Sequence, residues 1–224
     1  MGGLFNIDSP LMKALGKVAD LMILNLLVVI MCIPVITAGA AFSAMHYVLL
    51  KMVRGEEGYV IKSFFRSFKE NFRQATILWL IVLLFVLIFI VDFLILRYSG
   101  IAFPRILVYS LLFLVLIGAM LVIYIFALQS HFVNTVRGTL KNAVLIMIAN
   151  LPRSIVMLIL TLMPAALLYV TSRIMPLVLL LGITVPAYGC AFLYSPVFRR
   201  FEGEEEKEPE EYILEEQEAR DDCE

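Results

Sequence analysis

Residues 75–96 read ATILWLIVLLFVLIFIVDFLIL, and this stretch decides the fold class. It contains one charged side chain, Asp92, and no glycine or proline. A helix of about 20 consecutive apolar residues is long enough to cross the hydrocarbon core of a bilayer, which is roughly 30 Å thick. The stretch therefore predicts an integral membrane protein in which these residues form one span.

The composition of the whole chain agrees with this prediction. Of its 224 residues, 62% are hydrophobic and 17% are charged, and the mean hydropathy is +0.94. Soluble domains have about 45–50% apolar and about 25% charged residues, and a single core could not bury this much apolar surface. The composition therefore predicts an all-α, polytopic helical bundle whose outer surface is covered by lipid.

Proline, glycine and charged residues divide the apolar sequence into segments. Ser9 and Pro10 favour a helix start, and Pro34 marks a stop. The small residues of 38–44 would let neighbouring helix backbones approach closely. A five-span alternative merges 18–50 into one overlong helix through Pro34. We favour six spans, at about 10–33, 37–53, 75–96, 104–128, 153–171 and 174–198.

Residues 59–74 carry a basic stripe, defined as Lys62, Arg66, Lys69 and Arg73. Spacings of four, three and four residues place these side chains on one helix face. Phenylalanines occupy the adjoining face, which predicts an amphipathic helix in the cytoplasmic bilayer interface with its basic groups at anionic headgroups. The alternative is a charged extension of the next span. Arg153 is predicted to reach headgroups as well, which makes five candidate headgroup-binding residues.

The placement of Lys and Arg predicts the orientation. With six spans and a cytoplasmic N-terminus, only Arg97, Arg105 and Arg173 lie outside, and the other 15 of the 18 bases lie on the cytoplasmic side. This asymmetry matches the positive-inside rule. Both termini are therefore predicted to be cytoplasmic.

The C-terminal residues 202–224 form an acidic tail. They hold 13 of the 19 acidic residues and two bases, a net charge of −11. Such a composition is typical of a disordered segment. We predict a mobile cytoplasmic tail, with Tyr212, Ile213 and Leu214 as a short apolar contact for a partner.

Few residues indicate chemistry. No phosphate-binding loop, dinucleotide motif or catalytic motif is present, and His46 and His131 stand alone in the sequence. Asp20 and Asn25 are the candidate intramembrane polar residues, because polar groups in spans are costly and often functional. They face a polar pocket between helices, or Asp20 pairs with Lys17 one turn earlier. We predict no enzyme, no cofactor, no metal site and no nucleic-acid partner.

Several segments resemble the YesL-like proteins, a family of bacterial multi-spanning membrane proteins of unknown function. They include GLFNIDSP (3–10), PVITAGA (34–40), YVLLKMVR (47–54), SFFRSFKENF (63–72) and residues 134–142. The resemblance covers nearly all of 1–200 and excludes the acidic tail. It implies a bacterial plasma-membrane protein whose relatives are often encoded beside carbohydrate-uptake transporters and sensor kinases. It supplies no catalytic or ligand residues.

Two functions are compatible with these features. The first is a non-enzymatic accessory membrane protein that associates with a carbohydrate transporter or a sensor kinase and otherwise contacts the lipid bilayer. The second is a small-solute transporter or channel in its own right, which needs a polar path between the spans.

Overall fold

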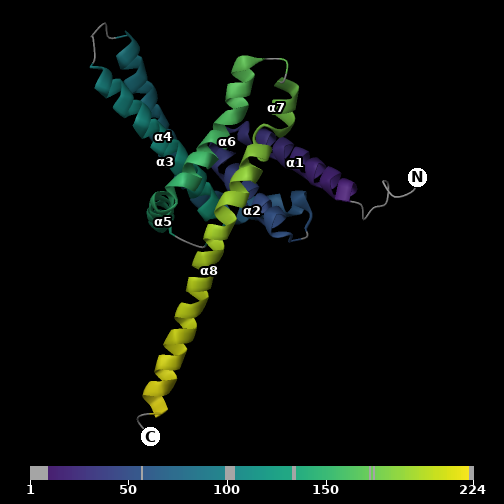
Figure 1. Cartoon of the computed structure of the whole chain (residues 1–224), viewed down its shortest axis with the longest axis vertical. Coiled ribbons are helices and arrows are strands. Elements are labelled where there is room, and N and C mark those ends of the chain that lie inside the picture. Colours follow the sequence, from purple (N-terminus) through teal and green to yellow (C-terminus); the bar gives the residue numbers. More distant parts are fainter. Residues whose placement is uncertain are drawn as a thin grey trace, which may run out of the picture.

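The computed structural model describes residues 10–56, 58–98, 104–132, 135–171, 173 and 175–221; the side chains at 10, 11, 179 and beyond 202 lie outside that description. In this part of the chain every regular element is helical, which confirms the predicted all-α class (Figure 1). The elements are α1 (Pro10–Cys32), η1 (Val35–Thr37), α2 (Ala38–Arg54), α3 (Val60–Tyr98), α4 (Arg105–His131), α5 (Val136–Ala149), α6 (Leu151–Val170), α7 (Met175–Leu181) and α8 (Thr184–Asp221).

Five of the described helical segments are long and apolar enough to cross a membrane, by length and composition. They are Met12–Cys32, Val35–Arg54, Val60–Tyr98, Arg105–His131 and Leu151–Val170. The first two are separated at Ile33 and Pro34, so the merged helix of the five-span alternative is not formed. The sixth predicted span, 174–198, is not one of the five.

The chain at 174–198 is divided between α7 and the beginning of α8. Gly182 donates a backbone hydrogen bond to the carbonyl of Val178 at 2.7 Å, and the helix stops there. Pro186 is the third residue of α8, where its missing N–H removes no intrahelical bond. The helix therefore restarts just before this proline, and the predicted continuous helix is divided into two.

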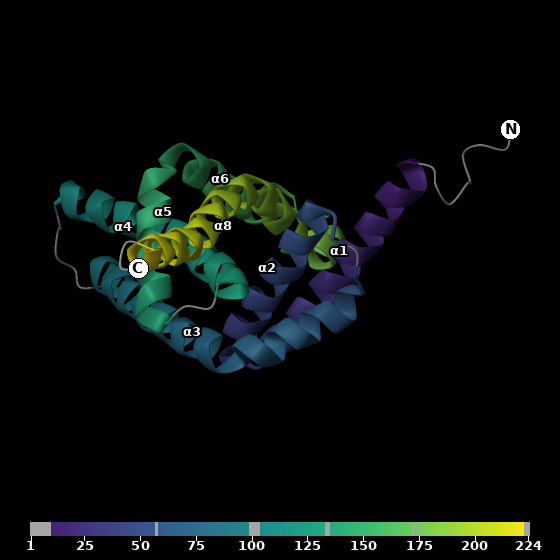
Figure 2. The same cartoon turned by 90° about the horizontal axis from the view of Figure 1, so that it is seen from below.

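In α3, by contrast, two predicted elements are joined into one helix. The predicted interfacial helix 59–74 and the span 75–96 form one helix of 39 residues, about 58 Å long at 1.5 Å per residue. The sequence changes from basic to apolar near Ala75, but it contains no glycine or proline that would end a helix. α3 is longer than the roughly 30 Å of hydrocarbon. Figure 2 shows it as a curved helix along one edge of the bundle.

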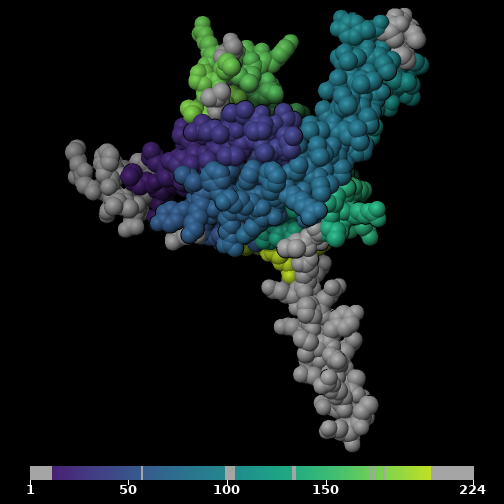
Figure 3. Space-filling model, turned by 180° about the vertical axis from the view of Figure 1, so that it is seen from behind, coloured from purple at the N-terminus to yellow at the C-terminus, as the bar shows by residue number. Residues whose placement is uncertain are grey.

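The two halves of α3 have different surroundings. The first half lies beside α1 across the body of the molecule, and the second half rises with α4 as a protruding arm (Figure 3). Phe64 is fully buried in the first half, whereas Leu84 and Phe93 are 58% and 62% exposed in the second. The first half is therefore packed against protein, and the arm presents an apolar surface suited to lipid.

α2 is the central helix. In the most apolar 18-residue stretch of this candidate span, 61% of the residues are buried, compared with at most 33% in the corresponding stretches of the other four. The small residues predicted to permit close packing are buried here, and Gly39 lies against the backbone of Ala75 and the base of Trp79 in α3. Trp79 Nε1 also donates to the Val35 carbonyl at 2.7 Å. These contacts hold α2 and α3 together at one level of the bundle.

The remaining helices complete the bundle. α5 begins at Val136, because Thr135 caps it by accepting from the Gly138 N–H at 3.2 Å. The backbone of α8 continues as helix to Asp221 and extends away from the bundle (Figure 1). The predicted disorder of 202–224 and the predicted contact through Tyr212, Ile213 and Leu214 stay predictions, because those side chains lie outside the described residues after Glu202.

Candidate functional site

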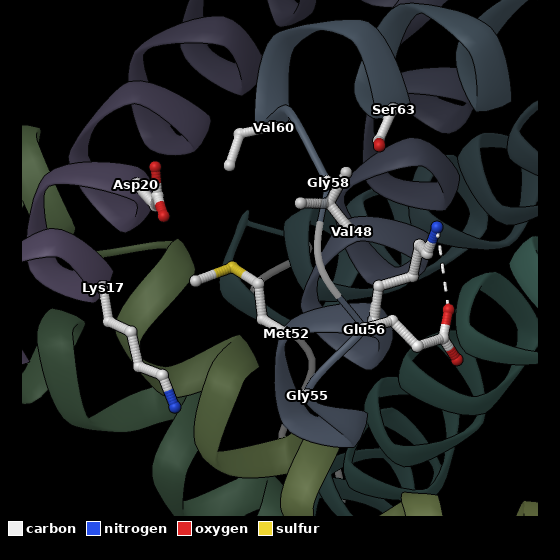
Figure 4. Close-up of a pocket in the computed structure, with 10 residues that line it drawn as sticks. Lys17, Asp20, Val48, Met52, Gly55, Glu56, Gly58, Val60 and Ser63 are labelled. Atoms are coloured by element: carbon white, nitrogen blue, oxygen red, sulfur yellow. Dashed lines mark ion pairs between the residues drawn. The ribbon is translucent and has the colours of Figure 1, made fainter. Parts of the chain in front are cut away.

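A cleft with charged walls opens between α1, the end of α2 and the start of α3 (Figure 4). Its volume is about 310 Å³. We call it the mixed-charge cleft, because among the described residues two bases and two acids line it together with apolar and small residues. The lining residues are Lys17, Asp20, Val48, Lys51, Met52, Gly55, Glu56, Gly58, Val60 and Ser63.

The turn between α2 and α3 forms one wall of this cleft. Gly55 has a φ of 74°, the left-handed conformation that glycine adopts without steric cost. Its N–H and that of Glu56 bond to carbonyls of the last turn of α2, including the Lys51 carbonyl at 3.0 Å from Glu56 N. The turn thereby places the Glu56 carboxylate 3.6 Å from Lys51 Nζ.

The other charged wall comes from α1. Lys17 is exposed and Asp20 is half-buried, and both line the cleft. Neither forms a hydrogen bond or an ion pair in the described part of the chain, so the pairing of Asp20 with Lys17 is not formed in this structure. The 3.6 Å separation of Lys51 and Glu56 is also longer than a hydrogen bond. The cleft therefore contains charged groups whose hydrogen-bonding capacity is available to a ligand.

Asn25 lies elsewhere and has a different role. It is fully buried, and its Oδ1 accepts hydrogen bonds from the backbone N–H groups of Ile183 and Thr184, each at 3.2 Å. Thr184 Oγ1 in turn donates to the Leu21 carbonyl at 3.0 Å. Asn25 thus caps the start of α8 from a neighbouring helix. Among the described residues, Asp20 lines the mixed-charge cleft and Asn25 does not.

The basic stripe lies on the outside of α3. All four of its side chains are exposed, and Arg66 pairs with Glu70 at 2.9 Å. On the adjoining face Phe64, Phe68 and Phe72 contact one another in series, with ring centroids 6.1 and 5.5 Å apart. Arg153 is half-buried at the beginning of α6. The stripe is thus placed to contact a surface outside the bundle.

Three residues far apart in the sequence form a charged cluster that was not among the predicted site residues. Arg54 Nη2 lies 2.7 Å from Glu202 Oε1, and His131 Nε2 contacts the same oxygen. Burial raises the pKa of Glu202, but hydrogen bonds from Arg54 and His131 outweigh it, so this pKa lies below its ordinary value. The cluster joins the ends of α2 and α4 to the first acidic residue of the tail. No local sequence pattern indicates it, because the partners are 71 and 148 residues apart.

Replacing Glu202 with glutamine should lower the free energy of unfolding at neutral pH by about 1–2 kcal/mol, because a hydrogen bond between charged groups is worth about 1.5–3 kcal/mol and exposure reduces it. A depressed carboxyl pKa stabilises the fold above the unfolded value, ordinarily 4.5, and that stability is lost as the pH falls through the folded pKa. Denaturation of the purified protein across pH should show a smaller loss in acid for the variant.

A chain truncated after Glu202 is the control for this experiment. It keeps the carboxylate and removes most of the acidic tail, so its stability should match that of the full chain. Identical acid dependence of the full chain and the Glu202→Gln variant would contradict a stabilising role for the cluster.

Several other buried polar groups are bonded within the bundle. His46 Nδ1 lies 3.1 Å from the Tyr194 hydroxyl, and the Tyr124 hydroxyl lies 3.1 Å from Ser154 Oγ. In the described residues, no three His, Cys, Asp or Glu side chains gather as a candidate metal site. These contacts connect helices and do not resemble a nucleophile and base arrangement.

An apolar cavity of about 440 Å³ lies beside the break between α7 and α8. Gly182, Ile183 and Pro186 line it at the break, and His46 and Cys190 are among its few polar groups. A broken helix next to a cavity is a feature of many transporters. The apolar lining provides little to bind a polar solute.

Comparisons with known proteins identify one similarity. Residues 21–93 match the model of a family described as protein of unknown function, DUF624. The matched segment runs from α1 through α2 and into α3, and it includes much of the mixed-charge cleft. No curated protein and no solved structure gave a match.

Proposed function

We propose that this chain is a YesL-like, non-enzymatic accessory protein of the bacterial plasma membrane that associates with a carbohydrate transporter or a sensor kinase. The resemblance of its N-terminal segments to the YesL-like proteins is the basis for the carbohydrate context. The match of residues 21–93 to a family of unknown function is compatible with this proposal and adds no activity.

One observation favours an accessory role over transport. In the described residues the buried polar side chains are bonded inside the bundle, and only Ser43 Oγ and Arg54 Nε are buried without a hydrogen-bond partner. Asn25, which could have lined a path, caps α8 instead. A polar solute crossing the membrane needs side chains that can replace its water, and the bundle interior offers few.

Affinity purification of the tagged chain from its native membrane, after cross-linking, tests the accessory role. We expect subunits of a carbohydrate transporter or a sensor kinase to co-purify. A chain with the basic stripe changed to glutamine controls for capture through charge alone. Recovery of the chain without either class of partner would contradict the proposal.

A transport function is the second candidate, and the break at Gly182 beside the 440 Å³ cavity favours it. Purified chain in liposomes should then move a small solute without any partner. Under the accessory proposal such liposomes show no uptake above that of empty vesicles.

The proposed topology has six spans, with α7 and the start of α8 crossing together as a broken sixth span. In Figure 1 the α3–α4 pair and the α6–α7 pair point, apart from each other, toward one end of the molecule, and the distal part of α8 points toward the other. This separation of two ends is compatible with cytoplasmic termini. The proposed interfacial segment is the first half of α3, with the basic stripe at the headgroups.

Single-cysteine labelling in intact cells, after replacement of the native cysteines, tests this topology. An impermeant reagent should label cysteines at 100 and 172, which lie outside the described residues, and should not label cysteines at Arg54, Thr139 or 204. The expected difference follows from the 15 to 3 distribution of basic residues. Labelling at Arg54 in unbroken cells would overturn the orientation.

A further inference from the structure

We propose that the mixed-charge cleft binds a phosphoethanolamine group, a zwitterion with a primary ammonium and a phosphate. The proposal does not depend on the carbohydrate context above. It starts from the charges on the cleft walls, which are Lys17 and Lys51 on one hand and Asp20 and Glu56 on the other. Their formal charges cancel.

Balanced charge selects the class of ligand. A simple anion would be repelled by Asp20 and Glu56, and a simple cation by the two lysines. A ligand that carries a positive and a negative group can pair with the carboxylates and with the lysines. The carboxylates accept hydrogen bonds from its ammonium group, and the lysines donate to its phosphate oxygens. Asp20 has no partner of its own in the described residues, and Lys51 makes no hydrogen bond there.

The position of the cleft fits a lipid headgroup. It lies where α2 ends and α3 begins, directly before the basic stripe that starts at Lys62. Apolar residues form part of its wall, including Val48, Met52 and Val60 (Figure 4). Its volume of about 310 Å³ is at the lower end of the range for small-ligand sites, about 300–1,000 Å³. A charged head joined to an apolar body would meet matching surfaces.

The test uses the purified full-length chain in detergent, titrated with phosphatidylethanolamine, phosphatidylcholine or phosphatidylglycerol while bound lipid is counted by native mass spectrometry. Phosphatidylcholine shares the phosphate, but its quaternary ammonium has no N–H to donate. We expect phosphatidylethanolamine to bind at least tenfold more tightly than either of the other lipids. Equal binding of phosphatidylethanolamine and phosphatidylcholine would overturn the proposal.

Two variants separate the roles of the walls. Asp20→Asn should remove the preference for phosphatidylethanolamine over phosphatidylcholine, because the ammonium loses its acceptor. Lys51→Gln should weaken both lipids by about the same factor and keep the preference, because both carry the phosphate. This second variant keeps the test decisive if Asp20→Asn does not fold. A preference that survives in Asp20→Asn, or one lost in Lys51→Gln alone, contradicts the assignment.

Matched controls lie outside the cleft. Asp92→Asn removes a half-buried carboxylate from the α3 arm, and Lys141→Gln removes an exposed lysine from α5. Both variants should bind the three lipids as the unaltered chain does. A loss of the lipid preference in either control would show that general charge, and not the cleft, is responsible.

A second arm identifies the source of the ligand. Water-soluble phosphoethanolamine and inorganic phosphate are added in turn, and the shift in thermal unfolding is measured, because a ligand that binds the folded state stabilises it. A shift with phosphoethanolamine alone supports the proposal with a soluble metabolite as the source. A response to the lipid only supports it with the bilayer as the source. Equal shifts with both soluble compounds, or no binding in either arm, would overturn it.

Discussion

Replacing Asn25 with leucine should lower the free energy of unfolding by about 2–5 kcal/mol, because two backbone N–H groups at the start of α8 lose their acceptor. Asn25 Oδ1 accepts from Ile183 N and Thr184 N at 3.2 Å each. A buried donor left without a partner costs about 1–3 kcal/mol. Lipid offers no water to replace the lost bond. Leucine has the same branched arrangement of four side-chain heavy atoms and is the larger residue, so the substitution leaves no cavity.

Two further variants test whether the cap itself is responsible. Thr184→Val removes the bond from Thr184 Oγ1 to the Leu21 carbonyl but leaves the cap intact, so its cost should be about 0.5–1.5 kcal/mol. Leu26→Ala changes a neighbouring side chain that is 54% exposed, and it should have a small effect. Denaturation in mixed micelles gives all three values. An Asn25→Leu variant no less stable than Thr184→Val would refute the capping role.

The sequence could predict Asn25 as an important residue but not its role. A polar side chain in an apolar span is unusual in any sequence, and this alone made it a candidate. Its partners are 158 and 159 residues away in a segment that the hydropathy pattern treats as one continuous span. Only the folded chain shows that the helix is interrupted at Gly182 and that Asn25 accepts hydrogen bonds from the N–H groups where the next helix begins.

In α3 the hydropathy pattern predicted a helix boundary that the structure does not have. A change from basic to apolar side chains marks where a chain enters lipid, and we interpreted it as a boundary between two elements. Helix continuity depends on the backbone, and nothing between Val60 and Tyr98 interrupts it. The place where the chain enters lipid therefore differs from the place where the helix ends. The hydropathy pattern indicates entry into lipid and does not indicate the helix end.

The cluster of Arg54, His131 and Glu202 was beyond sequence reasoning for a third reason. Arg54 and His131 lie at the ends of α2 and α4, and Glu202 lies within α8 where the apolar sequence ends. Charged side chains are ordinary at such places, and no spacing connects them. The mixed-charge cleft is similar, because Lys17 and Asp20 meet the turn at Gly55 only through packing of α1 on α2 and α3. Local pattern predicted the helices, and tertiary packing decided which charges meet.

Replacing Gly39 with alanine should destabilise the protein by about 2–4 kcal/mol, although alanine is the better helix former by about 1 kcal/mol. A Cβ at this position would lie 2.4 Å from Trp79 Cβ and 2.6 Å from the Ala75 carbonyl oxygen. Both atoms are fixed to the α3 backbone, so no rotamer change relieves the overlap, and α2 and α3 must move apart. Overpacking of this kind costs about 1–3 kcal/mol and occasionally more.

Gly118 in α4 provides the matched control, because a Cβ there would meet no atom within 4 Å. Gly118→Ala should therefore stabilise the protein by up to about 1 kcal/mol, through helix propensity alone. The two substitutions are chemically identical, lie in two apolar helices and have opposite expected signs, which removes detergent and expression effects from the comparison. Separation of α2 from α3 should also weaken the bond from Trp79 Nε1 to the Val35 carbonyl, now 2.7 Å, and change the fluorescence of this single tryptophan. A Gly39→Ala variant as stable as Gly118→Ala would show that the helices are not in close contact at this level.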